Sequence, residues 1–189
     1  MQEDFKVVLF CGSSGGIDVL EHFLYPFEEM AKVAVVVVLH RKVSVKDYLS
    51  SYLNKKIRAK VITVEHGAPL EKGTVYLVPA GYHCLLENNM TLSLDLSAKV
   101  MFSRPSANVS LESFSYNLCE RLIAVVVSGA NSDGAEGVKW VRKRGGLVIV
   151  QNPIDAFAKA MPSAAIEALQ EVDDIVPAHH MYNTVAKYF

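Results

Sequence analysis

The stretch Val33-Ala34-Val35-Val36-Val37-Val38-Leu39-His40 decides the fold class of this chain. Valine favours strands, and a run that is apolar at every position is typical of a strand buried on both faces of a sheet. Residues 6–11 and 122–127 have the same character, and helix-like stretches such as residues 17–30 and 108–119 lie between these runs. Apolar strands that alternate with helices predict a parallel sheet covered by helices on both faces.

The rest of the chain continues this alternation. We expect an α/β fold with a doubly wound, mainly parallel sheet, in a Rossmann-like three-layer α/β/α arrangement with an antiparallel hairpin, as a single domain over residues 1–189. The hairpin is expected to turn at Asn88-Asn89, between residues 82–87 and 91–96. The other expected elements are strands at residues 60–65, 74–78, 147–150 and near Ile175, and helices at residues 45–56, 135–144, 161–169 and from Tyr182.

Composition argues against several function classes. The chain carries 19 basic and 20 acidic residues, a net charge of −1, which argues against a nucleic-acid partner. No apolar run approaches the roughly 18 residues needed to cross a bilayer, and the acidic N-terminus is not a secretory signal. We therefore expect a cytoplasmic protein without direct membrane insertion, in which Cys11, Cys84 and Cys119 are free thiols.

In parallel α/β sheets the chemistry sits at the carboxyl ends of the strands. The first strand is followed by Cys11-Gly12-Ser13-Ser14-Gly15-Gly16, a glycine-rich turn before a helix. The backbone N–H groups of such a turn suit a phosphate or an oxyanion, and Ser13 is placed like a nucleophile on a sharp strand-to-helix turn. A purely structural glycine-rich turn with a serine cap stays open as the alternative.

Two further strand ends carry polar residues. His40 follows the valine-rich strand, where an imidazole suits a general base, although a histidine leaving the core at an edge is the alternative. Asp133 follows the third strand within residues 128–137, and it either caps the next helix or holds an imidazole in one tautomer. Together the three strand ends predict a Ser13-His40-Asp133 triad at one edge of the sheet.

These residues resemble the catalytic domain of the chemotaxis protein-glutamate methylesterases, the CheB family, over nearly the whole chain. Ser13-Ser14-Gly15-Gly16, His40 and residues 129–134 are similar to the family's Ser-x-Gly-Gly, strand-end His and Gly-x-x-x-Asp-Gly patterns. Weaker matches in the same order are residues 73–79 with His83, then Arg104-Pro105-Ser106, Gln151-Asn152 and Met161-Pro162.

The resemblance implies a hydrolase that removes methyl esters from glutamyl residues on the cytoplasmic helices of methyl-accepting chemotaxis receptors. Some relatives also deamidate receptor glutamines, so a protein-glutamine glutaminase activity is implied as well. The site residues that it implies are Ser13 as nucleophile, His40 as base, Asp133 as its orienting partner, and Ser14, Ala130 and Met161 on the oxyanion and substrate side.

Three departures from the family pattern stand out. Many members carry a receiver domain before the esterase domain, whereas the first strand here begins about five residues from Met1, which makes a separate receiver protein an expected partner. Many members have Gly-Met-Gly where this chain has Gly129-Ala130-Asn131, and Asp where it has Asn108.

No cofactor or metal is expected, because no His, Cys or Asp cluster has ligand spacing and the adjacent side chains of His179-His180 are expected to point apart. His83 is expected to be a solvated hairpin histidine, with a place in the lining of the cleft as the alternative. Two other functions stay open: a catalytically altered regulatory or scaffolding module of a chemosensory or two-component pathway, and a nucleotide or phosphate binder using residues 12–16. The second lacks the lysine of a P-loop.

Overall fold

The computed structural model describes residues 5–26, 32–43 and 48–189. Within these residues the expected parallel sheet is present, with all neighbouring strands paired in parallel. Its seven strands follow the order β10 (Asp174–Val176), β9 (Leu147–Gln151), β8 (Leu122–Val126), β1 (Val7–Gly12), β2 (Ala34–Leu39), β5 (Thr74–Leu77) and β3 (Lys60–Thr63).

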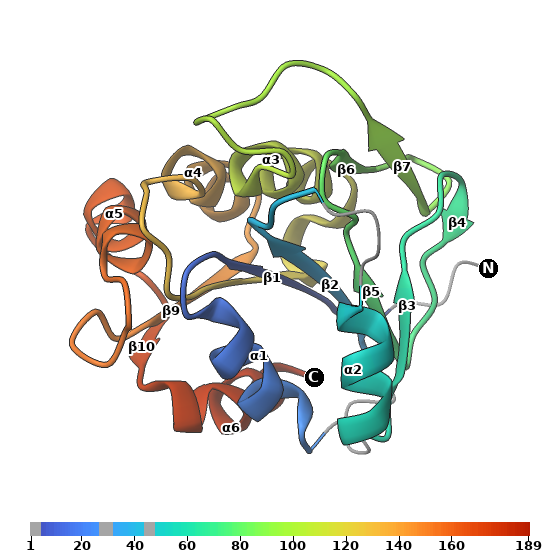
Figure 1. Cartoon of the computed structure of the whole chain (residues 1–189). Coiled ribbons are helices and arrows are strands. Elements are labelled where there is room, and N and C mark those ends of the chain that lie inside the picture. Colours follow the sequence, from blue (N-terminus) through green and yellow to red (C-terminus); the bar gives the residue numbers. More distant parts are fainter. Residues whose placement is uncertain (1–4, 27–31, 44–47) are drawn as a thin grey trace.

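Helices cover both faces of this sheet, as expected (Figure 1). One face carries α1 (Gly16–Leu24), α2 (Leu49–Lys56) and α6 (Met181–Val185). The other face carries α3 (Ala107–Leu118), α4 (Ala135–Lys143) and α5 (Ala160–Leu169). The result is the three-layer α/β/α arrangement that the alternation of strands and helices predicts.

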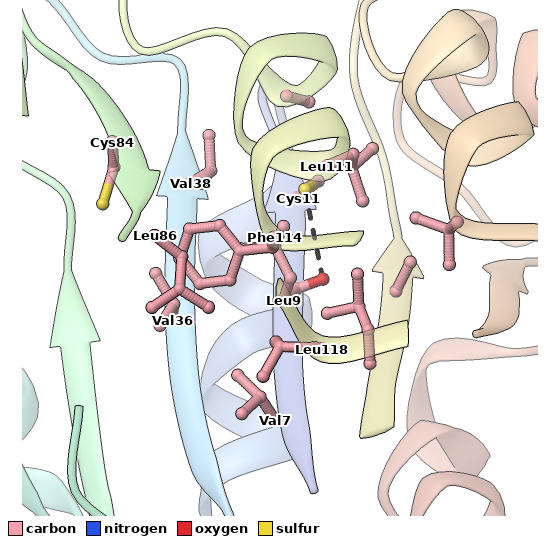
Figure 2. Packing of buried hydrophobic residues seen from close by; sticks show 14 of the residues in the cluster. Val7, Leu9, Cys11, Val36, Val38, Cys84, Leu86, Leu111, Phe114 and Leu118 are labelled. Carbon is pink, nitrogen blue, oxygen red and sulfur yellow. Dashed lines mark hydrogen bonds between the residues drawn. The ribbon is translucent and has the colours of Figure 1, made fainter. Parts of the chain in front are cut away.

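The central strands are buried on both faces. Val7, Leu9 and Cys11 of β1 point toward α3, where Figure 2 shows them beside Leu111, Phe114 and Leu118. Val8 and Phe10 point to the opposite face and pack with α1. All of these β1 side chains are fully buried, which explains why the sequence is apolar at every position of the strand.

The expected hairpin belongs to a small antiparallel sheet. β6 (His83–Leu86) pairs with β7 (Thr91–Asp95), and β7 pairs in turn with β4 (Ala68–Pro69). β4 was not expected, because two residues are too short for a periodic pattern. This sheet packs against α3, where the Ser110 hydroxyl donates to the Cys84 carbonyl at 2.8 Å. The hairpin thereby helps to position the start of α3.

The element boundaries differ from the expected ones by a few residues. Residues 27–31 of the expected first helix and residues 44–47, which include the start of the expected second, lie outside the described residues, and the described parts run over α1 and α2. Among the helices of the described ranges, none has the length and apolarity to cross a bilayer. All three cysteines are free thiols; burial raises the pKa of Cys84 to about 12.

The topology brings three strand ends together. The chain leaves β1 toward β2, β3 and β5 on one side, then returns to β8 on the other side of β1 and continues to β9 and β10. Because the strand order reverses beside β1, a crevice is expected at the carboxyl ends of β1, β2 and β8. These are the strands that Ser13, His40 and Asp133 follow.

Candidate active site

Ser13 lies on a tight turn between β1 and α1. Its N–H donates to the Ser128 carbonyl at 2.9 Å, and its own carbonyl accepts from the N–H of Gly16 at 2.9 Å. Gly15 has a φ of 81°, a left-handed conformation that glycine adopts without steric cost. The turn therefore holds Ser13, which is half-buried, at the rim of the sheet.

His40 is bonded to Asp133 at the end of β2. Its Nε2 lies 2.7 Å from Oδ2 of Asp133, and its backbone N–H donates to the Gly12 carbonyl at 3.1 Å. The His40 side chain is 11% exposed, whereas that of Asp133 is fully buried. With the Nε2–H donating to the carboxylate, the lone pair of a neutral imidazole lies on Nδ1, which is thus the basic nitrogen.

The Asp133 carboxylate accepts three more hydrogen bonds. They come from the Ser106 hydroxyl at 2.8 Å, the Ala107 N–H at 2.7 Å and the Asn108 N–H at 3.0 Å. Burial alone raises the pKa of Asp133, but the bonds from His40, Asn108, Ser106 and Ala107 outweigh it and lower that pKa. The start of α3 also favours an anion because its first N–H groups have no partner within the helix, so Asp133 stays ionised.

Asp133 and Asn108 cap each other's helices. Asp133 caps α3, while Asn108 Oδ1 accepts from the N–H groups of Gly134 at 2.9 Å and Gly137 at 2.8 Å near the start of α4. The alternative in which Asp133 caps the helix that follows it is therefore wrong. The exchange of caps locks α3, α4 and the loop that carries Asp133 into one unit.

Gly129 occupies a gap between Ser13 and Met161. A Cβ built on Gly129 would lie 2.6 Å from Sδ of Met161 and 3.1 Å from Cβ of Ser13, so only glycine fits there. Backbone bonds fix its place, because its N–H donates to Ala158 and its carbonyl accepts from Met161, both at 2.9 Å. Met161, expected on the substrate side, is fully buried behind Gly129.

Ser128 is a residue that sequence reasoning missed. Its hydroxyl donates to the Ser14 carbonyl at 2.6 Å and accepts from the Ala158 N–H at 2.8 Å, while its backbone N–H donates to Oε1 of Gln151 at 2.8 Å. It thereby ties the turn of Ser13 to the loop after β9. A single serine inside a glycine-rich loop gives no sequence signal for this role.

Two backbone donors lie open at the nucleophile turn. Within the described part of the chain, the N–H groups of Ser14 and Ala130 donate to no other residue, and both residues are exposed. Among the same residues, no hydrogen bond joins the Ser13 hydroxyl to His40. Catalytic hydrogen bonds are often long in ligand-free enzymes and tighten in the substrate complex.

The expectation of a solvated His83 is wrong. This histidine is fully buried; its Nδ1 accepts from the Ser106 N–H at 3.2 Å, and its Nε2 lies 3.0 Å from the Ala98 carbonyl. The ring is therefore neutral, with its proton on Nε2. Burial is favourable because both nitrogens find backbone partners, and it fixes Ser106, which in turn bonds to Asp133.

Comparison with known proteins places the chain in a family. Residues 8–185 match the sequence model of the CheB methylesterases. The chain belongs to the CheB methylesterase family. The resemblance suggested by the motifs is thus confirmed, and the chain is assigned to an enzyme family of carboxylic ester hydrolases, which disfavours the regulatory-module alternative.

Individual relatives are consistent with the assignment of this chain to the CheB family. A protein of Leptospira interrogans, provisionally named a protein-glutamate methylesterase/protein-glutamine glutaminase, is 34% identical over 165 residues, 87% of this chain and 86% of its own length. A Methanosarcina mazei protein with that name is 29% identical over 96% of this chain but only 51% of its own length. The crystal structure of the Thermotoga maritima CheB methylesterase catalytic domain superimposes with a TM-score of 0.93, at 25% identity, over 99% of this chain and all of that one.

Proposed function

We propose that this CheB-family chain is a protein-glutamate methylesterase that uses Ser13, His40 and Asp133 as a catalytic triad. The observation that carries the proposal is the buried Asp133 carboxylate bonded to Nε2 of His40, at the sheet edge where the turn of Ser13 ends. The substrate is the methyl ester of a glutamyl side chain on the cytoplasmic helices of a chemoreceptor. The compartment is accordingly the cytoplasm, and a separate receiver protein is the proposed controlling partner.

The acylation step uses the basic Nδ1 of His40. The Ser13 Oγ attacks the ester carbonyl carbon while His40 takes the hydroxyl proton, and Asp133 stabilises the imidazolium that forms. The tetrahedral intermediate collapses when His40 returns the proton to the leaving methoxide. Methanol departs, and the glutamyl group remains on Ser13 as an acyl ester.

Water completes the cycle. His40 removes a proton from a water molecule, the hydroxide attacks the acyl carbon, and Ser13 leaves with the proton from His40. The products are a free glutamate side chain and the regenerated enzyme. With a glutamine side chain the same steps release ammonia in place of methanol, so the proposal includes deamidation as a second activity.

The oxyanion of each tetrahedral intermediate is assigned to the N–H groups of Ser14 and Ala130. Both groups are open to a ligand, and both lie next to the residues that hold Ser13 in place. Donors of this kind contribute about 3–4 kcal/mol each to transition-state stabilisation. Gly129 lets the loop that carries Ala130 approach the turn of Ser13, because a Cβ on Gly129 would lie 3.1 Å from Cβ of Ser13.

Methanol release from receptor membranes tests the proposal. Wild-type protein is incubated with membranes whose receptors carry labelled methyl esters, and the labelled methanol is counted. The Ser13→Ala variant should lose at least 10³-fold in rate. Ser132→Ala changes an exposed serine in the Asp133 loop and serves as the matched control that keeps the wild-type rate.

Methanol release at the wild-type rate by the Ser13→Ala variant would refute the triad. A wild-type protein that releases no methanol would instead favour the regulatory module. Ammonia release from receptors with glutamine at the same positions, measured in parallel, decides the deamidation half of the proposal.

A further inference from the structure

Gln151 is a buried polar residue that has no part in the proposed triad. It is the last residue of β9 and is only 1% exposed. The paired register of β8 and β9 ends at Val126 and Val150, so Gln151 stands just beyond it. A buried side-chain amide is costly unless it is hydrogen-bonded, so its partners show what it holds in place.

The Gln151 amide is hydrogen-bonded at both ends. Its Oε1 accepts from the backbone N–H of Ser128 at 2.8 Å, and its Nε2 donates to Oδ2 of Asp155 at 3.1 Å. The same oxygen of Asp155 accepts from the N–H of Ala178 at 2.6 Å, and this bond is the main cause that lowers the pKa of Asp155. An ionised carboxylate only accepts hydrogen bonds, so it takes the NH₂ end of the amide and leaves the amide oxygen for Ser128.

Ser128 in turn bonds the backbone at the proposed nucleophile and at the next residue. Its carbonyl accepts from the Ser13 N–H at 2.9 Å, and its hydroxyl donates to the Ser14 carbonyl at 2.6 Å. Ser128 is fully buried. A shift of Ser128 would therefore move Ser13 together with Ser14, whose N–H is the proposed oxyanion donor.

We propose that Gln151 is a positioning residue for the proposed esterase reaction, because it fixes the Ser128 backbone that holds the turn of Ser13. A misplacement of about 1 Å at a reacting group can cost about 10²-fold in rate, so loss of this support should lower kcat. The proposal rests on the proposed function for the reaction that is measured. The hold of Gln151 on the turn follows from the hydrogen bonds alone.

Two double variants that differ in one acceptor atom test the proposal. Both contain Asp155→Ala; one adds Gln151→Glu and the other adds Gln151→Met. The glutamate keeps an oxygen for the Ser128 N–H, and the removal of Asp155 takes away the carboxylate that would repel it. The methionine is of similar size, but its sulfur is only a weak acceptor.

Hydrolysis of a glutamyl methyl ester peptide gives the first readout. We expect Gln151→Glu/Asp155→Ala to keep kcat within about threefold of Asp155→Ala alone, and Gln151→Met/Asp155→Ala to lose about 10- to 100-fold. KM should change by less than about twofold, because the buried Gln151 acts on the reacting groups and not on the bound peptide.

Asn54→Leu is the matched control. Oδ1 of Asn54 also accepts a buried-side backbone N–H, that of Val61 at 3.0 Å, but in β3 at the edge of the sheet. This variant should have a lower unfolding midpoint and an unchanged kcat. The unfolding midpoint of every variant confirms that it is folded at the assay temperature.

Amide hydrogen exchange gives a second readout without turnover. The N–H groups of Ser13 and Ser128 should exchange faster in Gln151→Met/Asp155→Ala than in Gln151→Glu/Asp155→Ala. This acceleration should exceed that of the N–H groups of β2 by at least about 10-fold, because the opening is local to the turn. A general loss of stability would accelerate all of these groups alike.

Each outcome supports or overturns the proposal. Equal kcat in the two double variants overturns it, as does an equal acceleration of exchange at Ser13, at Ser128 and in β2. A fall of kcat in Asn54→Leu as large as in the methionine variant also overturns it, because the loss would then follow from stability. If the wild-type protein hydrolyses no ester but the exchange rates differ as expected, the proposed function fails while the hold of Gln151 on the turn stands.

Discussion

The Asp133→Asn substitution tests the hydrogen bonds by which the Asp133 carboxylate holds His40 and the start of α3. Asp133 accepts hydrogen bonds on both oxygens: Oδ1 from Ser106 and Asn108, Oδ2 from His40 and Ala107. An asparagine has the same shape but replaces one of these acceptors by an NH₂ donor. Whichever way the amide is turned, its NH₂ group faces a backbone N–H at the start of α3.

Each orientation of the amide has its own cost. With the NH₂ group toward His40, Nε2 must become the acceptor, the ring proton moves to Nδ1, and the base that takes the Ser13 proton is lost. With the NH₂ group toward Asn108, the backbone N–H of Asn108 is left unpaired. One unpaired buried N–H costs about 1–3 kcal/mol, and the lost anion at the helix start adds about 0.3–1 kcal/mol. The wrong tautomer lowers kcat by about 10⁴-fold in triad enzymes.

We therefore expect a loss in the free energy of unfolding of about 1–4 kcal/mol and a fall in kcat of about 10³- to 10⁴-fold. Urea unfolding gives the first quantity and hydrolysis of a glutamyl methyl ester peptide the second. Asp173→Asn is the matched control, because Asp173 also accepts a backbone N–H, that of Val148 at 2.7 Å, but at the opposite end of the sheet. It should lower stability without changing kcat.

A folded Asp133→Asn protein that keeps kcat within tenfold of the wild type would show that Asp133 does not set the tautomer of His40. So would a kcat that falls equally in the Asp173→Asn control, because the loss would then follow from stability alone.

Three further predictions follow from the same contacts. Gly129→Ala should abolish ester hydrolysis and lower the unfolding midpoint, because its Cβ would collide with Met161 Sδ at 2.6 Å; unchanged kinetics would contradict this. His83→Leu should lower the free energy of unfolding by about 1–3 kcal/mol in urea titrations, because the Ser106 N–H loses its acceptor. The pKa of Asp133 is lower in the folded protein than in the unfolded chain, so its ionised carboxylate stabilises the fold above pH ~4, and this contribution is lost as the pH falls further. In urea titrations, the free energy of unfolding should therefore fall less on acidification for Asp133→Asn than for the wild type.

The sequence predicts the strand ends well because their signals are local. An apolar run ends where a polar residue begins, so Ser13 and His40 can be placed at the carboxyl ends of β1 and β2 without knowledge of the rest of the chain. Asp133 is placed by the same reasoning. The three-layer architecture follows from the alternation of such runs with helices, and the structure confirms it.

The contacts that hold the site together could not be predicted. Asn108 and Asp133 cap each other's helices across 25 to 29 residues of sequence, and no local pattern records such an exchange. His83 bonds to a carbonyl 15 residues away and to an N–H 23 residues away, so its environment depends on the path of the whole segment between β7 and α3. A polar residue at a hairpin start is most often solvated, which is why burial was not expected.

Covalent labelling tests whether Ser13 is the activated nucleophile of the site. A fluorophosphonate probe is added to folded wild-type protein, and intact mass followed by peptide mapping identifies the modified residue. We expect one label per chain, on Ser13, with labelling lost in urea and at least 10²-fold slower in Asp133→Asn. A folded protein that takes up no label, or takes it up on another serine, would show that Ser13 is not the nucleophile.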